Sequence, residues 1–239
     1  MWAARVTSRA KEVGPESQAP AVAAAGAKPL DAWWTVLVVD PVALRLLPAL
    51  AARSSITPLR LTLLGAAISA ASIPAFATEH FVLGAVLFQV GFFFDCLDGK
   101  LARMRGETSR LGAFLDQALD VLVRTGAFVA LAWHAFPDSR IAPALVAAIV
   151  LLEAWLRTYP TEAGPGSAGT ALPGALGRAR AAMARRRLVL LPATVDLEAL
   201  SLFLAPLTGS IELIRIGVVV AMAGYAFYGL LHVRRIVRG

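Results

Sequence analysis

The chain has 239 residues, of which 58% are hydrophobic and only 16% are charged, and its formal net charge is +7. Since a soluble domain carries about a quarter charged residues, this composition favours a polytopic membrane protein. The single cysteine, Cys96, excludes an intramolecular disulfide and a multi-cysteine zinc site within the chain, and the three scattered histidines offer no metal-ligand spacing.

The N-terminal part of the sequence divides into two segments. Residues 1–31 are rich in alanine, proline and glycine and lack the apolar core of a signal peptide, which predicts a disordered arm. Residues 32–56 are apolar but are interrupted by prolines and by Asp40. This pattern predicts an interfacial juxtamembrane helix, amphipathic in character, with Trp33 and Trp34 at the level of the lipid headgroups.

Residues 57–236 contain six apolar runs long enough to cross a bilayer. We place them near residues 59–78, 81–104, 111–136, 141–159, 188–208 and 211–233. After the fourth run, residues 160–174 are rich in proline, glycine and serine, which predicts a flexible loop. We therefore expect an all-α integral membrane protein with six transmembrane helices, preceded by the interfacial amphipathic helix.

The distribution of the basic residues gives the expected orientation. Arginines gather in the turn near 104–110, in the loop before the fifth run and in the C-terminal tail, whereas the opposite connections contain only Arg140. Cytoplasmic loops of membrane proteins carry such an excess. We therefore predict a protein of the cell membrane with both termini and the active site on the cytoplasmic side. The positive charge is explained by topology, and we expect no nucleic-acid partner.

Four aspartates interrupt the second and third runs in the stretch DCLDGKLARMRGETSRLGAFLDQALD, residues 95–120. Asp95 and Asp98 are three residues apart and Asp116 and Asp120 are four apart, so each pair shares a helix face. The short basic turn between the runs makes the two helices antiparallel neighbours, which brings the four carboxylates to similar depth. Carboxylates at membrane depth are costly and usually mark a functional site.

Four carboxylates in a low dielectric cannot all remain ionised without cations. Oxygen ligands suit Mg²⁺ or Mn²⁺, and we predict a pair of such ions at the four aspartates. A two-metal carboxylate site typically binds phosphate and stabilises an in-line displacement at phosphorus. Gly99 and Gly112 allow a ligand to approach the backbone closely, and Arg103 offers a forked donor to a phosphate or base oxygen. The residues thus predict metal-dependent phosphoryl chemistry at a membrane surface.

The same stretch resembles the signature D-x2-D-G-x2-A-R-x8-G-x3-D-x3-D of the CDP-alcohol phosphotransferase (CDP-alcohol phosphatidyltransferase) family. Its eight fixed positions are all present at the family's spacings: Asp95, Asp98, Gly99, Ala102, Arg103, Gly112, Asp116 and Asp120. The six-span layout is also similar to that family, and the likeness covers about residues 41–236.

The resemblance implies a reaction in which an acceptor hydroxyl attacks the β-phosphorus of a CDP-linked donor and CMP leaves. It implies that Asp95, Asp98 and Asp116 hold the metal ions and that Asp120 is a further ligand or the catalytic general base. It also implies a homodimer.

For the nucleotide, the resemblance implies a cradle of five residues, which are Thr62, Gly99, Ala102, Arg103 and Gly112. The family often has Pro-Asn-x-x-Thr at the start of the first span, and this chain keeps Pro58 and Thr62 but has Leu59 in place of the asparagine. The nucleotide contact at that position is therefore open, with Arg60 as a substitute.

The acceptor pocket is the part that the sequence leaves open. Arg124 either binds an acceptor phosphate or pairs with a carboxylate such as Glu153, and Arg157 either contacts the acceptor or forms a helix ion pair with Glu153. Asp196 and Glu198 interrupt the fifth run and indicate a face toward a wet cavity. Inositol phosphate, glycerol phosphate, serine and a lipid alcohol all remain as acceptors.

We therefore predict a membrane enzyme of phospholipid biosynthesis. It would transfer a phosphatidyl group from a CDP-linked lipid donor, CDP-diacylglycerol or another CDP-alcohol, to a small alcohol acceptor, while the lipid tails stay among the membrane lipids. The alternative is a divalent-cation transporter that uses the same carboxylates. Gly99, Ala102 and Arg103 at the family's spacing speak against it, because a cation path requires none of them.

Overall fold

The computed structural model describes residues 26–159 and 174–238, and the regular elements there are all helical. In the N-terminal half these are η1 (Thr35–Val39), α2 (Asp40–Ala51), α3 (Pro58–Ala70), α4 (Ser72–Ala77), α5 (Phe81–Arg105) and α6 (Arg110–Ala135). In the C-terminal half they are α7 (Ala142–Leu156), α8 (Gly174–Arg185), α9 (Thr194–Glu198), η2 (Ala199–Leu204), α10 (Ala205–Leu207) and α11 (Ile211–Arg238). Short π-helical turns form η1 and η2.

Helices occur at all six of the predicted apolar runs, as α3–α4, α5, α6, α7, α9–α10 and α11. Three of these units are long and apolar enough to cross a membrane: Pro58–Ala77, Phe81–Arg105 and Ile211–Val237. α7 is apolar but shorter, and α6 is long but carries charged residues along its first half. The structure therefore confirms an all-helical fold with three candidate membrane spans among the described residues.

The two predicted flexible segments lie mostly outside the described residues. The arm at 1–31 is described only from residue 26, and the loop at 160–174 only at its last residue. Residues 26–34 are not an isolated arm, because the backbone of Asp31 pairs with that of Leu188 in an isolated β-bridge. Between the predicted loop and the fifth apolar run, the chain forms the helix α8, which has no buried residue.

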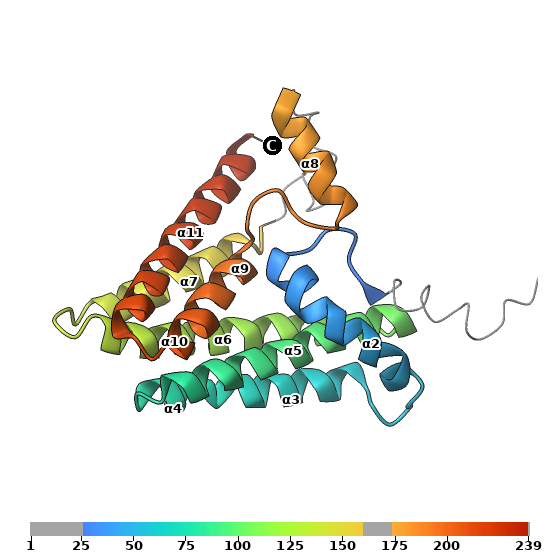
Figure 1. Cartoon of the computed structure of the whole chain (residues 1–239), viewed down its shortest axis with the longest axis horizontal. Helices are drawn as coiled ribbons and strands as arrows, with labels where there is room; N and C mark the ends of the chain where they lie inside the picture. The colour runs from blue at the N-terminus through green and yellow to red at the C-terminus, as the bar shows by residue number, and fades with distance from the viewer. Residues whose placement is uncertain (1–25, 160–173, 239) are drawn as a thin grey trace, which may run out of the picture.

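Figure 1 shows α3, α5 and α6 in one layer, in which α3 packs against both α5 and α6, with α7, α9–α10 and α11 at one end of this layer and α2 at the other. One apolar core joins α4, α6, α7 and α11, with members such as Phe128, Val150 and Tyr225. A second core joins η1 and α2 to α3 and α5, with members such as Leu47 and Leu101. The second core fastens the N-terminal helices beside the part of α5 that carries the aspartates.

Two glycines let α3 and α5 pack backbone against backbone. A Cβ added to Gly91 would lie 1.9 Å from the Oγ of Ser69 and 2.6 Å from the carbonyl oxygen of Gly65. Real Cβ atoms do not approach other atoms so closely, so any side chain at Gly91 would push the helices apart. Asp95 follows Gly91 by four residues and lies on the same face of α5. The close contact therefore sets the distance of this aspartate from α3.

The turn between α5 and α6 is short because both helix ends are capped locally. α5 ends at Gly106, whose φ of +67° is the left-handed conformation that glycine adopts without strain. α6 begins after Ser109, whose Oγ accepts a hydrogen bond from the backbone N–H of Gly112 at 2.9 Å. The two helices are thereby held as an antiparallel hairpin, as the sequence predicts.

Candidate active site

The hairpin of α5 and α6 brings three of the four aspartates together. Asp95, Asp98 and Asp116 each offer a carboxylate oxygen that lies within 4.8 Å of the other two. Asp98 is buried and the other two are half-buried. Such spacing is short enough for a single cation to contact all three carboxylates.

The donor set of these aspartates fits a hard divalent cation. Oδ2 of Asp98 and Oδ1 of Asp116 are buried, and neither accepts a hydrogen bond from any described residue. A buried carboxylate oxygen without a donor is destabilising unless a cation compensates it. Carboxylate oxygens are the ligands that Mg²⁺ and Mn²⁺ prefer, so the residues present suit such an ion.

Asp120 stands apart from this trio. Its side chain is 52% exposed, and its Oδ2 accepts a hydrogen bond from Nη2 of Arg124 at 3.2 Å. The carboxylate nevertheless lines the same cavity as Asp95 and Asp116, which we call the polar cavity. The aspartate is therefore accessible to a molecule in that cavity while an arginine on the next helical turn orients it.

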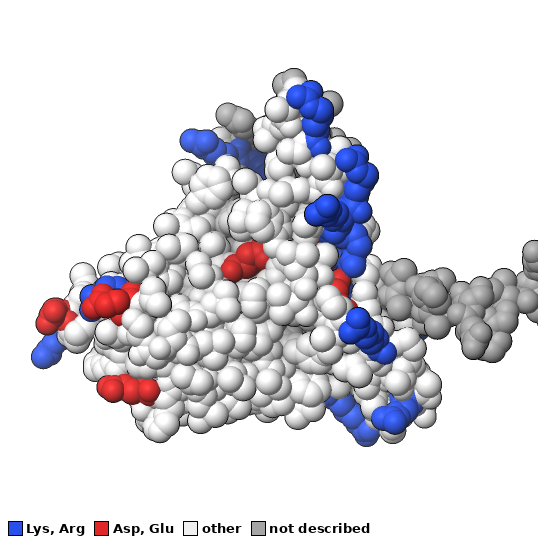
Figure 2. Space-filling model, in the orientation of Figure 1, with Lys and Arg blue, Asp and Glu red and all other residues white. Residues whose placement is uncertain are grey.

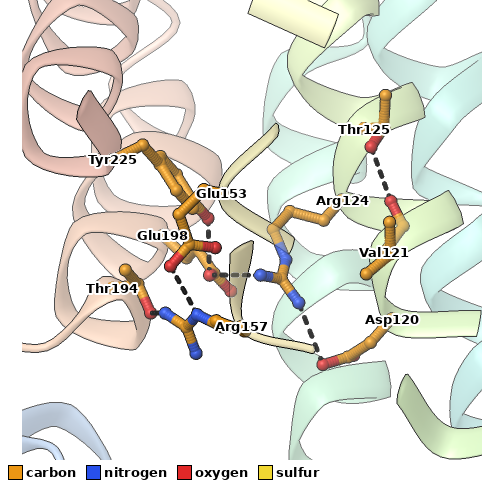
Figure 3. Close-up of polar contacts among 9 residues, drawn as sticks. All are labelled: Asp120, Val121, Arg124, Thr125, Glu153, Arg157, Thr194, Glu198 and Tyr225. Carbon is orange, nitrogen blue, oxygen red and sulfur yellow. Dashed lines mark hydrogen bonds and ion pairs between the residues drawn. The ribbon is translucent and has the colours of Figure 1, made fainter. Parts of the chain in front are cut away.

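A network of buried polar groups continues from Asp120 toward α9 and α11 (Figure 3). Nη1 of Arg124 lies 3.3 Å from Oε1 of Glu198, and the hydroxyl of Tyr225 donates a hydrogen bond of 2.6 Å to the same oxygen. The predicted alternative of an Arg124–Glu153 pair is not formed. Arg124 instead bridges Asp120 on its own helix and Glu198 on α9.

Glu153 pairs with Arg157, the partner that the sequence gives as one of two alternatives. Nε of Arg157 donates to Oε1 of Glu153, and Nη2 donates to the hydroxyl of Thr194 at 2.8 Å (Figure 3). The Glu153 side chain is only 4% exposed, whereas that of Arg157 is 46% exposed. The guanidinium is thus held in place and still reaches solvent.

Two cavities meet at the aspartates. The α3-side cavity, of about 410 Å³, is lined by all five residues of the predicted nucleotide cradle: Thr62, Gly99, Ala102, Arg103 and Gly112. The polar cavity, of about 240 Å³, is lined by both predicted acceptor residues, Arg124 and Arg157. Asp98 and Asp116 border both cavities. A molecule in either cavity would therefore meet the same carboxylates.

Leu59 stands where the family often has an asparagine, and the structure shows its surroundings. Leu59 lines the α3-side cavity, beside Pro58 and Thr62. Arg60, the substitute contact considered from the sequence, instead donates from Nη1 to the carbonyl oxygen of Ser55 at 2.5 Å and does not line this cavity. An apolar side chain therefore occupies the place of the family's usual asparagine.

Sequence reasoning missed one side of the polar cavity. Lys28, Asp31 and Thr35 line it, although they precede the first predicted span. It also missed Lys100, which lies within the signature stretch, is buried in the fold and pairs with Asp40 at 3.0 Å. No local pattern marks these residues, because their partners lie in distant parts of the chain.

The fold and the site define a helical membrane protein with an acidic cluster, suited to divalent metal ions, between two cavities. The sequence model of the CDP-alcohol phosphatidyltransferase family matches residues 54–222, which is most of the chain. The protein therefore belongs to the CDP-alcohol phosphatidyltransferase family.

Named relatives match over shorter stretches. The chain is 40% identical over 67 residues to the archaetidylinositol phosphate synthase of Pyrococcus horikoshii, which is 28% of this chain and 36% of that protein. It is 31% identical over 137 residues to the phosphatidylinositol phosphate synthase of Corynebacterium glutamicum, which is 56% of this chain and 60% of that protein. The chain thus spans between about a third and three fifths of these curated relatives.

Solved structures of one relative share the fold. A crystal structure of the phosphatidylinositol phosphate synthase of Mycobacterium tuberculosis with CDP-DAG bound has a TM-score of 0.50 and 20% identity, and the match covers 83% of this chain and 93% of that one. A structure of the same enzyme in complex with manganese and citrate has a TM-score of 0.51 and 20% identity, over 82% and 87% of the chains. At this identity the likeness concerns the fold alone.

Proposed function

We propose that this protein transfers a phosphatidyl group from a CDP-alcohol, with CDP-diacylglycerol as the donor, to the hydroxyl of a small alcohol in phospholipid biosynthesis. The observation that carries the proposal is the position of Asp98 and Asp116 between two cavities. One cavity contains the residues of the family's nucleotide signature, and the other contains arginines and hydroxyl groups. A donor and an acceptor in these cavities would meet at the carboxylates.

The proposed roles follow from this placement. The CDP moiety occupies the α3-side cavity, where Gly99 and Gly112 leave space beside the backbone and Arg103 offers its guanidinium to a phosphate. Asp95, Asp98 and Asp116 hold two ions of Mg²⁺ or Mn²⁺, for which Asp120 is the alternative fourth ligand if it is not the general base. When bound, such ions offset the negative charge of the pyrophosphate and of the transition state.

Asp120 is proposed as the general base. The acceptor oxygen forms a bond to the β-phosphorus of the donor, and the bond between that phosphorus and the bridging oxygen of CMP breaks, so CMP leaves with the electron pair. The acceptor proton passes to the carboxylate of Asp120, which is accessible from the polar cavity. Arg124 restricts the rotation of this carboxylate through the contact of 3.2 Å to Oδ2.

The membrane arrangement is part of the same proposal. Six helical units cross the bilayer within a domain at residues 57–236, while residues 32–56 lie at the cytoplasmic interface. Figure 2 supports this orientation, because Lys and Arg side chains gather around α8 and the end of the molecule near α2. Exposed arginines of that region include Arg178, Arg185 and Arg186. Both termini and the cavities would then face the cytoplasm. A homodimer is proposed from the family resemblance.

The test is CMP release by the purified protein in lipid-containing detergent. The protein receives CDP-diacylglycerol and Mg²⁺ or Mn²⁺, and single acceptors are added in turn, with Asp120→Asn as the control. We expect acceptor-dependent CMP that is lost in the variant and with a chelator. Intact metal binding without CMP from any acceptor would refute the proposal. Metal flux into vesicles without nucleotide would then favour the cation transporter.

A further inference from the structure

One wall of the polar cavity comes from a part of the chain outside the region that the family model matches. Lys28, Asp31 and Thr35 line this cavity together with Arg157 and Thr194. The family match begins only at residue 54. We call residues 26–35 the N-terminal wall. None of its residues lines the α3-side cavity.

The N-terminal wall is fastened to the segment that follows α8. The backbone N–H of Asp31 donates to the carbonyl oxygen of Arg187 at 2.8 Å, and the N–H of Val189 donates to the carbonyl oxygen of Asp31 at 3.2 Å. Nε of Arg187 donates to the carbonyl oxygen of Lys28 at 3.0 Å. These bonds fix the backbone of Lys28 and Asp31 beside the cavity.

A second set of contacts fastens the wall to α5. Nε of Arg103 donates to the carbonyl oxygen of Gly26 at 3.1 Å. A Cβ on Gly26 would lie 3.1 Å from the carbonyl oxygen of Lys100, so the wall packs tightly against the helix. Just beyond the wall, Asp40 makes buried ion pairs with Lys100 at 3.0 Å and with Arg187 at 2.9 Å. The wall is thus part of the folded site.

The basic side chains that line the cavity differ in whether a carboxylate pairs with them. Arg124 is engaged by Asp120 and Glu198, and Arg157 is engaged by Glu153 through one of its nitrogens. Lys28 is exposed and makes no ion pair with any of the described residues. The wall therefore presents an ammonium group whose charge no described carboxylate neutralises, on the same cavity as the half-exposed Arg157.

We propose that the N-terminal wall is the part of the site that selects the acceptor, and that Lys28 binds an anionic phosphate group on a phosphorylated polyol. The hydroxyls of Thr35 and Thr194 and the carboxylate of Asp31 are hydrogen-bonding partners suited to the polyol hydroxyls. Oδ1 of Asp31 already accepts from the N–H of Ala32 at 2.9 Å, which orients this carboxylate. The inference rests on the proposed function, because the polar cavity receives the acceptor only if the CDP donor occupies the other cavity.

The experiment measures equilibrium binding to the full chain in lipid-containing detergent with Mg²⁺, and does not depend on turnover. The probes are inositol 1-phosphate, glycerol 3-phosphate and unphosphorylated inositol. The variants are Lys28→Gln, Lys28→Arg and, as a matched control, Arg45→Gln. Arg45 is an exposed residue of α2 that lines neither the polar nor the α3-side cavity, so its loss changes the net charge equally without touching the site.

We expect Lys28→Gln to weaken the binding of a phosphorylated probe by about tenfold, because a charge-assisted contact is lost. Lys28→Arg should retain affinity within about threefold, since its guanidinium also binds phosphate. Arg45→Gln and the wild type should bind equally, and unphosphorylated inositol should bind more weakly than its phosphate.

Three results would overturn the inference: equal binding by Lys28→Gln and wild type, no preference of the wild type for a phosphorylated probe, or no binding of either phosphorylated probe. Phosphate binding that depends on Lys28 without any CMP release would refute the proposed function and leave the anion site intact. CMP release with an acceptor whose affinity does not depend on Lys28 would support the proposed function and refute the role of Lys28.

Discussion

The buried ion pair between Asp40 and Lys100 provides the sharpest test of how the N-terminal helices are attached to the site. The side chains are 3% and 2% exposed, and the Oδ1–Nζ distance is 3.0 Å. Replacing Asp40 by leucine leaves the Lys100 ammonium buried without this partner, which costs about 3–5 kcal/mol of unfolding free energy. Arg187, the other partner of Asp40, is 31% exposed and can turn to water, so its contribution is smaller.

A double-mutant cycle separates the pair from the packing around it. Asp40→Leu and Lys100→Met are each expected to destabilise, whereas the combined variant removes both charges and should recover most of the loss. Unfolding is followed in mixed detergent micelles at several denaturant concentrations. Asp138→Leu is the control, because Asp138 is exposed and forms no ion pair with a described residue. If the unfolding free energy of Asp40→Leu lies within about 0.5 kcal/mol of the wild-type value, the ion pair does not fasten α2 to α5.

Three further predictions concern the site and its frame. Asp98→Asn removes a carboxylate with an unpartnered buried oxygen, and we expect metal affinity, measured by calorimetry, to fall by at least about 100-fold. Glu198→Gln leaves Arg124 with a single carboxylate partner, so the guanidinium should bind Asp120 more closely and lower kcat by about tenfold with a smaller change in the acceptor KM. Gly91→Ala forces α3 and α5 apart and should reduce the unfolding free energy by about 1–3 kcal/mol in the micelle assay.

Each of these has a control within the chain. Asp138→Asn should leave metal affinity unchanged, and metal binding by Asp98→Asn at the wild-type midpoint would contradict the assignment of that ligand. For Glu198→Gln, a rise in the acceptor KM at constant kcat would assign Glu198 to the acceptor instead of to Arg124. Gly229→Ala is the control for Gly91→Ala, because a Cβ at Gly229 meets only Leu156 Cδ1, at 3.4 Å. This alanine should be neutral or slightly stabilising.

The sequence predicts the helical frame and the acidic cluster because both depend on local order. Backbone groups in hydrocarbon must be satisfied within their own segment, so each long apolar run becomes a helix. Residues three and four apart share a helix face, and Gly106 and Ser109 close a short turn, so Asp95, Asp98 and Asp116 meet as expected. The same hairpin places Gly99, Ala102, Arg103 and Gly112 along one cavity, and the packing of α3 against α5 adds Thr62.

Only the tertiary structure decides which distant groups meet. Arg124 has a choice of carboxylates in the sequence, and the packing of α9 against α11 places Glu198 beside it, while Glu153 pairs with Arg157. The N-terminal wall reaches its partners across 159 residues in the contact between Arg187 and Lys28. Periodicity and spacing encode contacts within one helix or hairpin, but a contact between segments so far apart depends on how every intervening helix packs. The lining of the polar cavity is therefore a property of the folded chain.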